Sequence, residues 1–137
     1  MICLDTNAII ASINLRPPTV RRRLQQTLVD GTIIGIPTVA LYELWYGIKK
    51  SARPQANAAA LATFMILDVT SWPFEPEDAE EAGDIRAALD RSGTPIGPYD
   101  VLIAAQARRR GALLVTSNAS EFSRVPGLKT TDWASPD

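Results

Sequence analysis

The sequence contains no histidine among its 137 residues. This absence excludes the imidazole general bases and the histidine metal ligands that many hydrolases use. If the protein is an enzyme, its chemistry must come from carboxylates, hydroxyls, lysines or a bound metal ion.

Cysteine is almost absent as well, since Cys3 is the single one. An internal disulfide and a cysteine-based metal site are therefore excluded, and the composition suits a reducing cytoplasm. Residues 1–5 lack the basic segment that opens a signal peptide, and the apolar stretch 33–48 is interrupted by Pro37 and Glu43. We expect a cytoplasmic protein with no membrane-spanning segment.

The sequence also has little net charge, because 14 basic and 15 acidic residues give a formal charge of −1. It lacks the overall basic character that drives nonspecific nucleic-acid binding, so any site for a polyanion must be local. Three basic clusters are candidates: residues 21–23, Lys49–Lys50 with Arg53, and residues 108–110. The alternative is that each cluster is a solvated helix face.

Hydrophobic residues make up 46% of the chain and charged residues 21%, which is typical of a globular protein rather than a disordered one. A chain of this length can form one domain with its own core. We expect a single domain over residues 1–133 and a short tail over residues 134–137.

Short apolar runs that end in polar residues predict buried strands, and segments with a 3.6-residue apolar repeat predict helices. The clearest helix covers residues 38–50, with Thr38 as its expected N-cap. We expect its apolar face to pack in the core through Leu41, Leu44, Trp45 and Ile48. The predicted strands are 2–4, 32–36, 66–69, 113–116 and 128–130, and the other predicted helices are 19–29, 55–64, 76–91 and 98–110.

Strands and helices alternate along the chain, which favours an α/β fold with a mostly parallel central sheet, helices on both faces and right-handed crossovers. Two consecutive helices, 38–50 and 55–64, break the alternation and predict a helical hairpin inserted beside the sheet. In such folds the ligand crevice lies outside the carboxyl ends of the strands. Polar side chains at these ends are therefore candidate functional residues.

Asp5 directly follows the first predicted strand, so its carboxylate should lie at the carboxyl edge of the sheet. Thr6 and Asn7 come next and would support the same site. The alternative is structural: Asp5 caps the following helix, while Thr6 and Asn7 fill the turn.

Glu43 lies in the middle of helix 38–50, and no other charged residue occurs between Ala40 and Ile48. Its neighbours one helical turn away are uncharged. Unless the side chain is simply exposed, a metal ion or a remote cation must offset the cost of desolvating it.

Asp100 lies two residues after Pro98, in the first turn of helix 98–110. A carboxylate at this position can also stabilise the helix dipole without any other role. A fourth group of polar residues, Thr116, Ser117 and Asn118, follows the strand predicted at 113–116. Asn118 could contribute its amide oxygen, or Glu121 could supply charge, and the sequence leaves both possibilities open.

Four segments thus bring oxygen atoms to one edge of the predicted sheet. Oxygen ligands without histidine or cysteine select hard cations, Mg²⁺ or Mn²⁺, over zinc. We expect Asp5, Glu43 and Asp100 to bind the metal, Asn118 to complete the catalytic site, and Thr6, Asn7, Thr116 and Ser117 to support it. Without a cation, crowding of like charges should raise the pKa of the three carboxylates.

The residues that carry these predictions occur in four segments: 4–7 (LDTN), 42–47 (YELWYG), 93–105 (GTPIGPYDVLIAA) and 116–128 (TSNASEFSRVPGL). Together they closely resemble the PIN-domain family, specifically the VapC-type toxins of bacterial toxin–antitoxin pairs. The resemblance spans nearly the whole chain. Its most specific piece is the Ile-Gly-Pro-x-Asp-x-Leu-Ile-Ala-Ala stretch at residues 96–105.

The resemblance implies a Mg²⁺-dependent endoribonuclease that acts on RNA, is usually dimeric, and is neutralised by a VapB-type antitoxin whose tail occupies the active-site groove. By position, Asp5, Glu43 and Asp100 match the family's three acidic residues. Asn118 stands where the fourth site residue is acidic in some members and asparagine in others. Gln106 replaces a histidine common in relatives, which we interpret as a tolerated departure because metal-based chemistry does not require imidazole.

A partner interface is predicted on the second helical region. Tyr42 and Tyr46 lie close together in a small domain that cannot bury every face of helix 38–50, and helix 55–64 follows. We expect a homodimer, and an antitoxin side chain, most plausibly arginine, that reaches the acidic site.

Two other functions are compatible with a parallel α/β sheet that has an Asp at a strand end. A phosphoaspartyl or receiver-like domain would need an adjacent acidic pair and a lysine after a later strand, whereas Thr6 and Asn7 follow Asp5 and no lysine occurs in residues 116–118. A non-catalytic binding module of the same fold would need none of the carboxylates. The sequence does not identify which RNA is cleaved.

Overall fold

Residues 1–135, the part of the chain that this computed structural model describes, form a five-stranded sheet in the order β3-β2-β1-β4-β5. The four strand pairings are all parallel. The strands are β1 (Ile2–Leu4), β2 (Ile34–Pro37), β3 (Thr70–Trp72), β4 (Leu113–Val115) and β5 (Thr130–Thr131). The predicted α/β fold with a parallel sheet is therefore confirmed.

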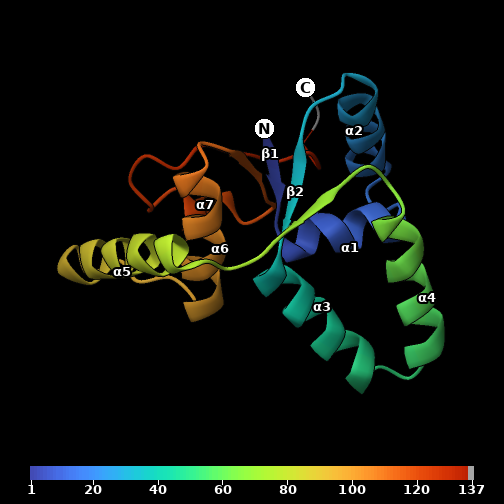
Figure 1. Ribbon diagram of the computed structural model, residues 1–137, viewed down its shortest axis with the longest axis horizontal. Coiled ribbons are helices and arrows are strands. Elements are labelled where there is room, and N and C mark those ends of the chain that lie inside the picture. The colour runs from blue at the N-terminus through green and yellow to red at the C-terminus, as the bar shows by residue number, and fades with distance from the viewer. Residues whose placement is uncertain (136–137) are drawn as a thin grey trace.

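Helices cover both faces of the sheet, as Figure 1 shows. One side carries α1 (Thr6–Asn14), α2 (Pro18–Val29), α3 (Thr38–Lys50) and α4 (Pro54–Met65). The other side carries α5 (Pro76–Arg91), α6 (Pro98–Arg109) and α7 (Ala119–Phe122). This division follows from the strand order: the chain moves outward from β1 to β3 and then returns to β4 beside β1, so right-handed crossovers place the later helices on the opposite face.

The point where the strand order reverses lies between β1 and β4, and it is where parallel α/β sheets bind ligands. Leu4 pairs with Val115 in the register of these two strands. The next residues, Asp5 and Thr116, therefore leave the sheet side by side, and the Asp5 backbone N–H donates to the Val115 carbonyl oxygen at 3.2 Å.

Helices α3 and α4 form the predicted helical hairpin beside the sheet. Its core side carries Ala40, Leu44 and Ile48, spaced one turn apart and all buried. Trp45, which was expected to pack in the core, is instead exposed. The expectation was wrong because residue 45 lies about 100° around the helix from Leu44, beyond the edge of this narrow buried face.

The structure also corrects several predicted boundaries. Helix α1 begins directly after Asp5, where the sequence suggested only a turn or a helix of unknown extent. The strand predicted over 66–69 lies at Thr70–Trp72, because Ile66 is the exposed C-cap of α4. The last strand is at Thr130–Thr131 rather than 128–130.

Thr38 is not the N-cap of α3, a position that Pro37 occupies. Its hydroxyl donates instead to the backbone oxygen of Trp72, at 2.6 Å. The hydroxyl therefore joins the start of α3 to the end of β3, which explains a polar residue at this position without a capping role.

A buried ion-pair network holds α5 against α6. Asp78 is fully buried, and its Oδ1 accepts hydrogen bonds from Arg109 Nε at 2.6 Å and Arg110 Nη1 at 2.9 Å. Burial works to raise the pKa of Asp78, but these arginines outweigh it and lower the pKa below its usual value. Arg108 pairs with Glu81 and Asp84 on the same helix. The basic cluster 108–110 therefore neutralises α5 and is not available as a polyanion site.

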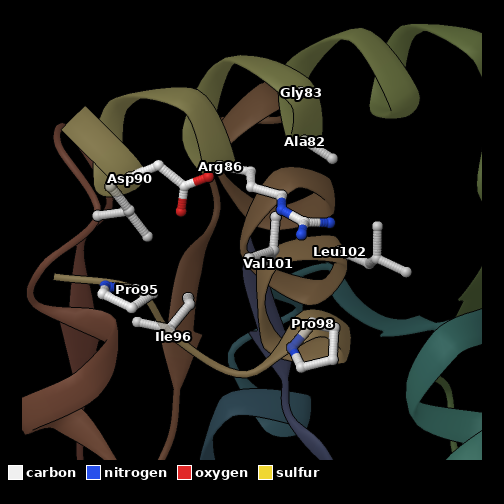
Figure 2. Close-up of a pocket in the computed structure, with 10 residues that line it drawn as sticks. Ala82, Gly83, Arg86, Asp90, Pro95, Ile96, Pro98, Val101 and Leu102 are labelled. Atoms are coloured by element: carbon white, nitrogen blue, oxygen red, sulfur yellow. The ribbon is translucent and has the colours of Figure 1, made fainter. Parts of the chain in front are cut away.

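A pocket of about 440 Å³ lies beside this helix pair. Figure 2 shows Arg86 and Asp90 reaching from α5 over Pro95, Ile96 and Pro98. None of the predicted metal-binding residues lines it, so this cavity is separate from the candidate site.

No helix within residues 1–135 is long and apolar enough to cross a membrane. The tail predicted for residues 134–137 falls partly outside the described residues, and Ala134 packs against the core as a partly buried side chain.

Candidate active site

Asp5 both caps a helix and lies at the carboxyl edge of the sheet, so its two alternative roles coincide. Its Oδ1 accepts a hydrogen bond from the Ala8 backbone N–H at 2.8 Å, and the residue is only 4% exposed. Burial is the main cause that raises the pKa of Asp5, and the charges of Glu43 and Asp132 add to it. Hydrogen bonds from Thr116 and Ala8 oppose the rise without cancelling it.

Glu43 approaches the same region from the first half of α3, which begins at the carboxyl end of β2. The Thr6 hydroxyl donates to its Oε1 at 2.8 Å. This bond links α1 to α3 and fixes one carboxylate oxygen of Glu43. Its partner is a hydroxyl group, not a cation, so the negative charge of Glu43 is not neutralised.

Asp100 is the third residue of α6, which packs against α3. Burial raises its pKa to about 6, and the charges of Glu121, Glu43 and Asp5 contribute further. The predicted rise in pKa thus holds for Asp5 and for Asp100. It shows that the carboxylates are close enough to repel one another.

The three predicted carboxylates line one pocket of about 220 Å³. The residues around it are Asp5, Thr6, Asn7, Glu43, Asp100, Ile103, Asn118 and Phe122. The structure therefore brings together Asn118 and both residues that follow Asp5. It does not include Ser117, which lines a neighbouring pocket of about 170 Å³ together with Asp132.

Asn118 and Glu121 divide the role that the sequence left open. Asn118 lines the pocket, whereas Glu121 lies behind it and accepts two hydrogen bonds. Its Oε1 accepts from the Gly97 backbone N–H at 2.8 Å, and its Oε2 accepts from Asn118 Nδ2. Because the Asn118 amide nitrogen is held by Glu121, its amide oxygen is the atom free to face a ligand.

Thr116 supports the site from the sheet. It is buried, and its hydroxyl oxygen accepts from the Asn118 backbone N–H at 2.9 Å. It also forms the hydrogen bond that opposes the raised pKa of Asp5. Sequence reasoning did not detect the positions of Glu121 and Asp132 near these groups, because both depend on how loops after β4 and β5 fold.

The chemistry of this site fits a hard divalent cation. Its donors are carboxylate and amide oxygens, and within residues 1–135 no lysine or arginine forms an ion pair with Asp5, Glu43 or Asp100. In the same part of the chain, no three acidic or cysteine side chains are already grouped as a ready metal cage. The carboxylates surround the pocket at a wider spacing, as expected for like charges without a cation between them.

A second cavity of about 240 Å³ adjoins the first. It is a mostly apolar groove between α1, α3 and α4, with Ile10, Ile13, Leu44 and Leu61 among its walls. Glu43 lines both cavities, so the groove leads to the carboxylate pocket.

The PIN domain, as a sequence family, matches residues 2–128 of this chain. The chain belongs to the PIN-domain family. This membership places it outside the phosphoaspartyl and receiver-like domains considered above.

Among PIN-domain proteins the chain is most usefully compared with VapC proteins. It is 43% identical to the "tRNA(fMet)-specific endonuclease VapC" of Shigella flexneri over 132 residues, covering 96% of each chain. It is 40% identical to the protein of the same name from Salmonella typhimurium, covering 95% of this chain and 96% of the relative. The resemblance to VapC-type proteins is therefore confirmed over nearly the full length.

Solved structures give the same result for the PIN-domain fold. The VapBC2 complex of Rickettsia felis, bound to a DNA fragment from its promoter, superposes with a TM-score of 0.90 at 33% identity, covering 97% of this chain and 99% of that one. The DNA-bound VapBC of Salmonella typhimurium gives a TM-score of 0.88 at 38% identity, with the same coverage of both chains. Both structures contain a toxin of this fold together with its antitoxin.

Proposed function

We propose that the protein is a Mg²⁺-dependent endoribonuclease and the toxin of a type II toxin–antitoxin pair. One observation carries the proposal: Asp5, Glu43 and Asp100 come from three separate elements and line one pocket without a basic partner among the described residues. The similarity to VapC endonucleases supports RNA as the substrate. Mn²⁺ can replace Mg²⁺, because both cations prefer oxygen ligands.

When bound, the cation would lower the pKa of a water molecule and neutralise charge that develops on the phosphodiester. The residues of this chain determine where the cation is held. Asp5 is oriented by Ala8 and Thr116, Glu43 by Thr6, and Asn118 by Glu121. Asp100 accepts no hydrogen bond from the described residues, so it is the carboxylate most free to adjust to a ligand.

Cleavage of RNA by the purified chain tests this proposal. The substrates should include tRNA(fMet), because two similar VapC proteins are named for it. We expect cleavage with Mg²⁺ or Mn²⁺, none with EDTA, and none by an Asp5→Asn variant. Asparagine is also a good N-cap, so this variant keeps the start of α1. A folded wild-type chain that cleaves no RNA with either cation would point instead to a non-catalytic binding module.

The same function implies an antitoxin partner. We propose that the tail of a VapB-type antitoxin lies in the groove between α1, α3 and α4 and reaches the carboxylate pocket past Glu43. An arginine is the side chain best suited to bind there, because its planar guanidinium pairs with carboxylates through two hydrogen bonds. Its positive charge would compete directly with the metal.

A further inference from the structure

The outward side of α3 carries a strip of aromatic and basic side chains, which we call the α3 aromatic face. It consists of Tyr42, Trp45, Tyr46, Lys49 and Lys50. Their spacing of three, four, seven and eight residues puts them on one side of the helix. The three aromatic side chains are between 42% and 59% exposed, although Leu44 and Ile48 of the same helix are buried. The aromatic residues therefore do not serve the core.

The α3 aromatic face begins at the rim of the carboxylate pocket. Tyr42 directly precedes Glu43, and its ring contacts that of Tyr99, with centroids 5.4 Å apart and planes tilted by 57°. Tyr99, itself 44% exposed, directly precedes Asp100. Two pocket carboxylates thus each have an exposed tyrosine beside them, and the two rings meet.

Positive charge lies along the same strip. Lys50 Nζ is 4.7 Å from the centre of the Tyr46 ring, and Lys49 Nζ is 5.6 Å from that of Trp45. Within residues 1–135 neither lysine forms an ion pair, whereas the arginines at 108–110 are all bonded to acidic or carbonyl oxygens. The strip therefore offers charge that the basic cluster on α6 cannot.

We infer that the α3 aromatic face binds the single-stranded RNA that flanks the cleaved bond, an inference that rests on the proposed ribonuclease function. Bases stack on exposed aromatic rings, and lysines beside the rings attract the adjoining phosphates. Eight residues of helix separate Tyr42 from Lys50, which is about 12 Å at 1.5 Å per residue and suits a few nucleotides. The strand then runs from the pocket outward along α3.

A protein partner is the other macromolecule that aromatic side chains can bind. The cores of protein–protein interfaces are enriched in tyrosine and tryptophan but depleted in lysine. Here lysines lie over the rings themselves, and Glu43 is the one acidic residue of α3. A polyanion therefore fits the strip better than a protein does.

Binding of a fluorescein-labelled, unstructured RNA in EDTA tests the inference without cleavage. We expect Trp45→Ala or Tyr46→Ala to weaken binding by between about fivefold and a hundredfold, since stacking contributes about 1–3 kcal/mol per base. Trp45→Phe should retain most of the affinity. Lys49→Ala with Lys50→Ala should weaken binding and make it less dependent on salt.

Two variants outside the strip serve as controls, Ile66→Ala for an exposed apolar side chain and Lys129→Ala for an exposed charge. Both should bind RNA as the wild type does. Trp45 gives a direct signal as well, because Trp72 and Trp133 are at most 8% exposed. RNA stacked on Trp45 should quench tryptophan emission, and the Trp45→Phe variant should lose that response.

The outcomes separate this inference from the ribonuclease proposal. If the wild type binds RNA but never cleaves it with Mg²⁺, the ribonuclease proposal fails while the binding face stands. If the wild type cleaves RNA and the strip variants bind like the controls, the binding face is wrong. A Trp45→Ala variant with unchanged RNA affinity but altered sedimentation would show that the strip contacts a second copy of the chain, which also overturns the inference.

Discussion

Asp100 lies in the pocket among three other acidic side chains that raise its pKa. Replacing it with asparagine removes one negative charge at nearly the same volume. We expect Asp100→Asn to reduce metal-dependent RNA cleavage by orders of magnitude while raising the melting temperature of the metal-free chain. Cleavage assays and thermal unfolding in EDTA measure both effects. Wild-type activity in a folded Asp100→Asn protein would contradict the assigned role.

The stability of the metal-free chain should depend on pH through the same residue. The pKa of Asp100 is about 6 in the folded protein against an ordinary 3.8. Because the folded-state value is higher, protonation favours folding; this stabilisation is complete below the ordinary pKa and is lost as the pH rises through about 6. We expect a higher melting temperature at about pH 5 than at about pH 7.5 in EDTA, and a smaller difference for Asp100→Asn.

Glu121 acts on the pocket through other residues, since it holds Asn118 and the Gly97 backbone in place. Residues that orient metal ligands typically change affinity by about 10–100-fold when mutated. We expect Glu121→Ala to weaken Mn²⁺ binding in calorimetry by an amount in this range. Glu80→Ala, which removes an exposed carboxylate from α5, is the matched control and should bind Mn²⁺ normally. Equal affinity in the two variants would remove Glu121 from the site.

At the scale of elements, the contact between α5 and α6 depends on Asp78. Asp78→Ala leaves Arg109 and Arg110 without their buried partner and removes the acceptor for the Glu75 backbone N–H. We expect a loss of roughly 3 kcal/mol in the free energy of unfolding, measured with urea. Asp84→Ala breaks a 2.6 Å pair with Arg108 whose carboxylate is 66% exposed, and it should cost less than about 1 kcal/mol. Similar losses in both variants would show that burial of Asp78 is unimportant.

The sequence predicted α3 and α5 with the bounds that the structure has, because each combines a long periodic pattern with a clear start at Thr38 or Pro76. It misplaced β3, since the apolar run 66–69 resembles a strand while the true strand buries only Trp72. The short α7 carries too few residues for a periodic pattern. Short elements are decided by tertiary contacts that the local sequence does not encode.

The positions of the candidate site residues were largely predictable. Asp5 and Asn118 follow strands, and the carboxyl ends of parallel strands meet at one edge, so their proximity follows from topology alone. The bonds from Thr6 to Glu43 and from Asn118 to Glu121 were not predictable, because they depend on side-chain conformations and on how α1 and α7 pack. Ser117 was misjudged for the same reason.

At the scale of the whole molecule, we expect the isolated chain to sediment as a homodimer and to lose RNase activity when mixed with its VapB-type partner. Apolar surface along the groove between α1, α3 and α4 gives that partner an extended contact. Analytical ultracentrifugation and activity titrated against the partner protein measure the two effects. A monomer at high micromolar concentration whose activity the partner leaves unchanged would overturn the partner proposal but not the nuclease proposal.

Because Glu43 lines both the apolar groove and the carboxylate pocket, two small ligands placed there would be close neighbours. An inhibitor could therefore be assembled from an apolar fragment for the groove and a cationic fragment for the pocket, joined by a short linker past Glu43. Once the first fragment is bound, the second meets its pocket at a high effective concentration, so the joined compound should bind far more tightly than either part. Helix α3 thereby makes a small chain accessible to fragment-based inhibitor design.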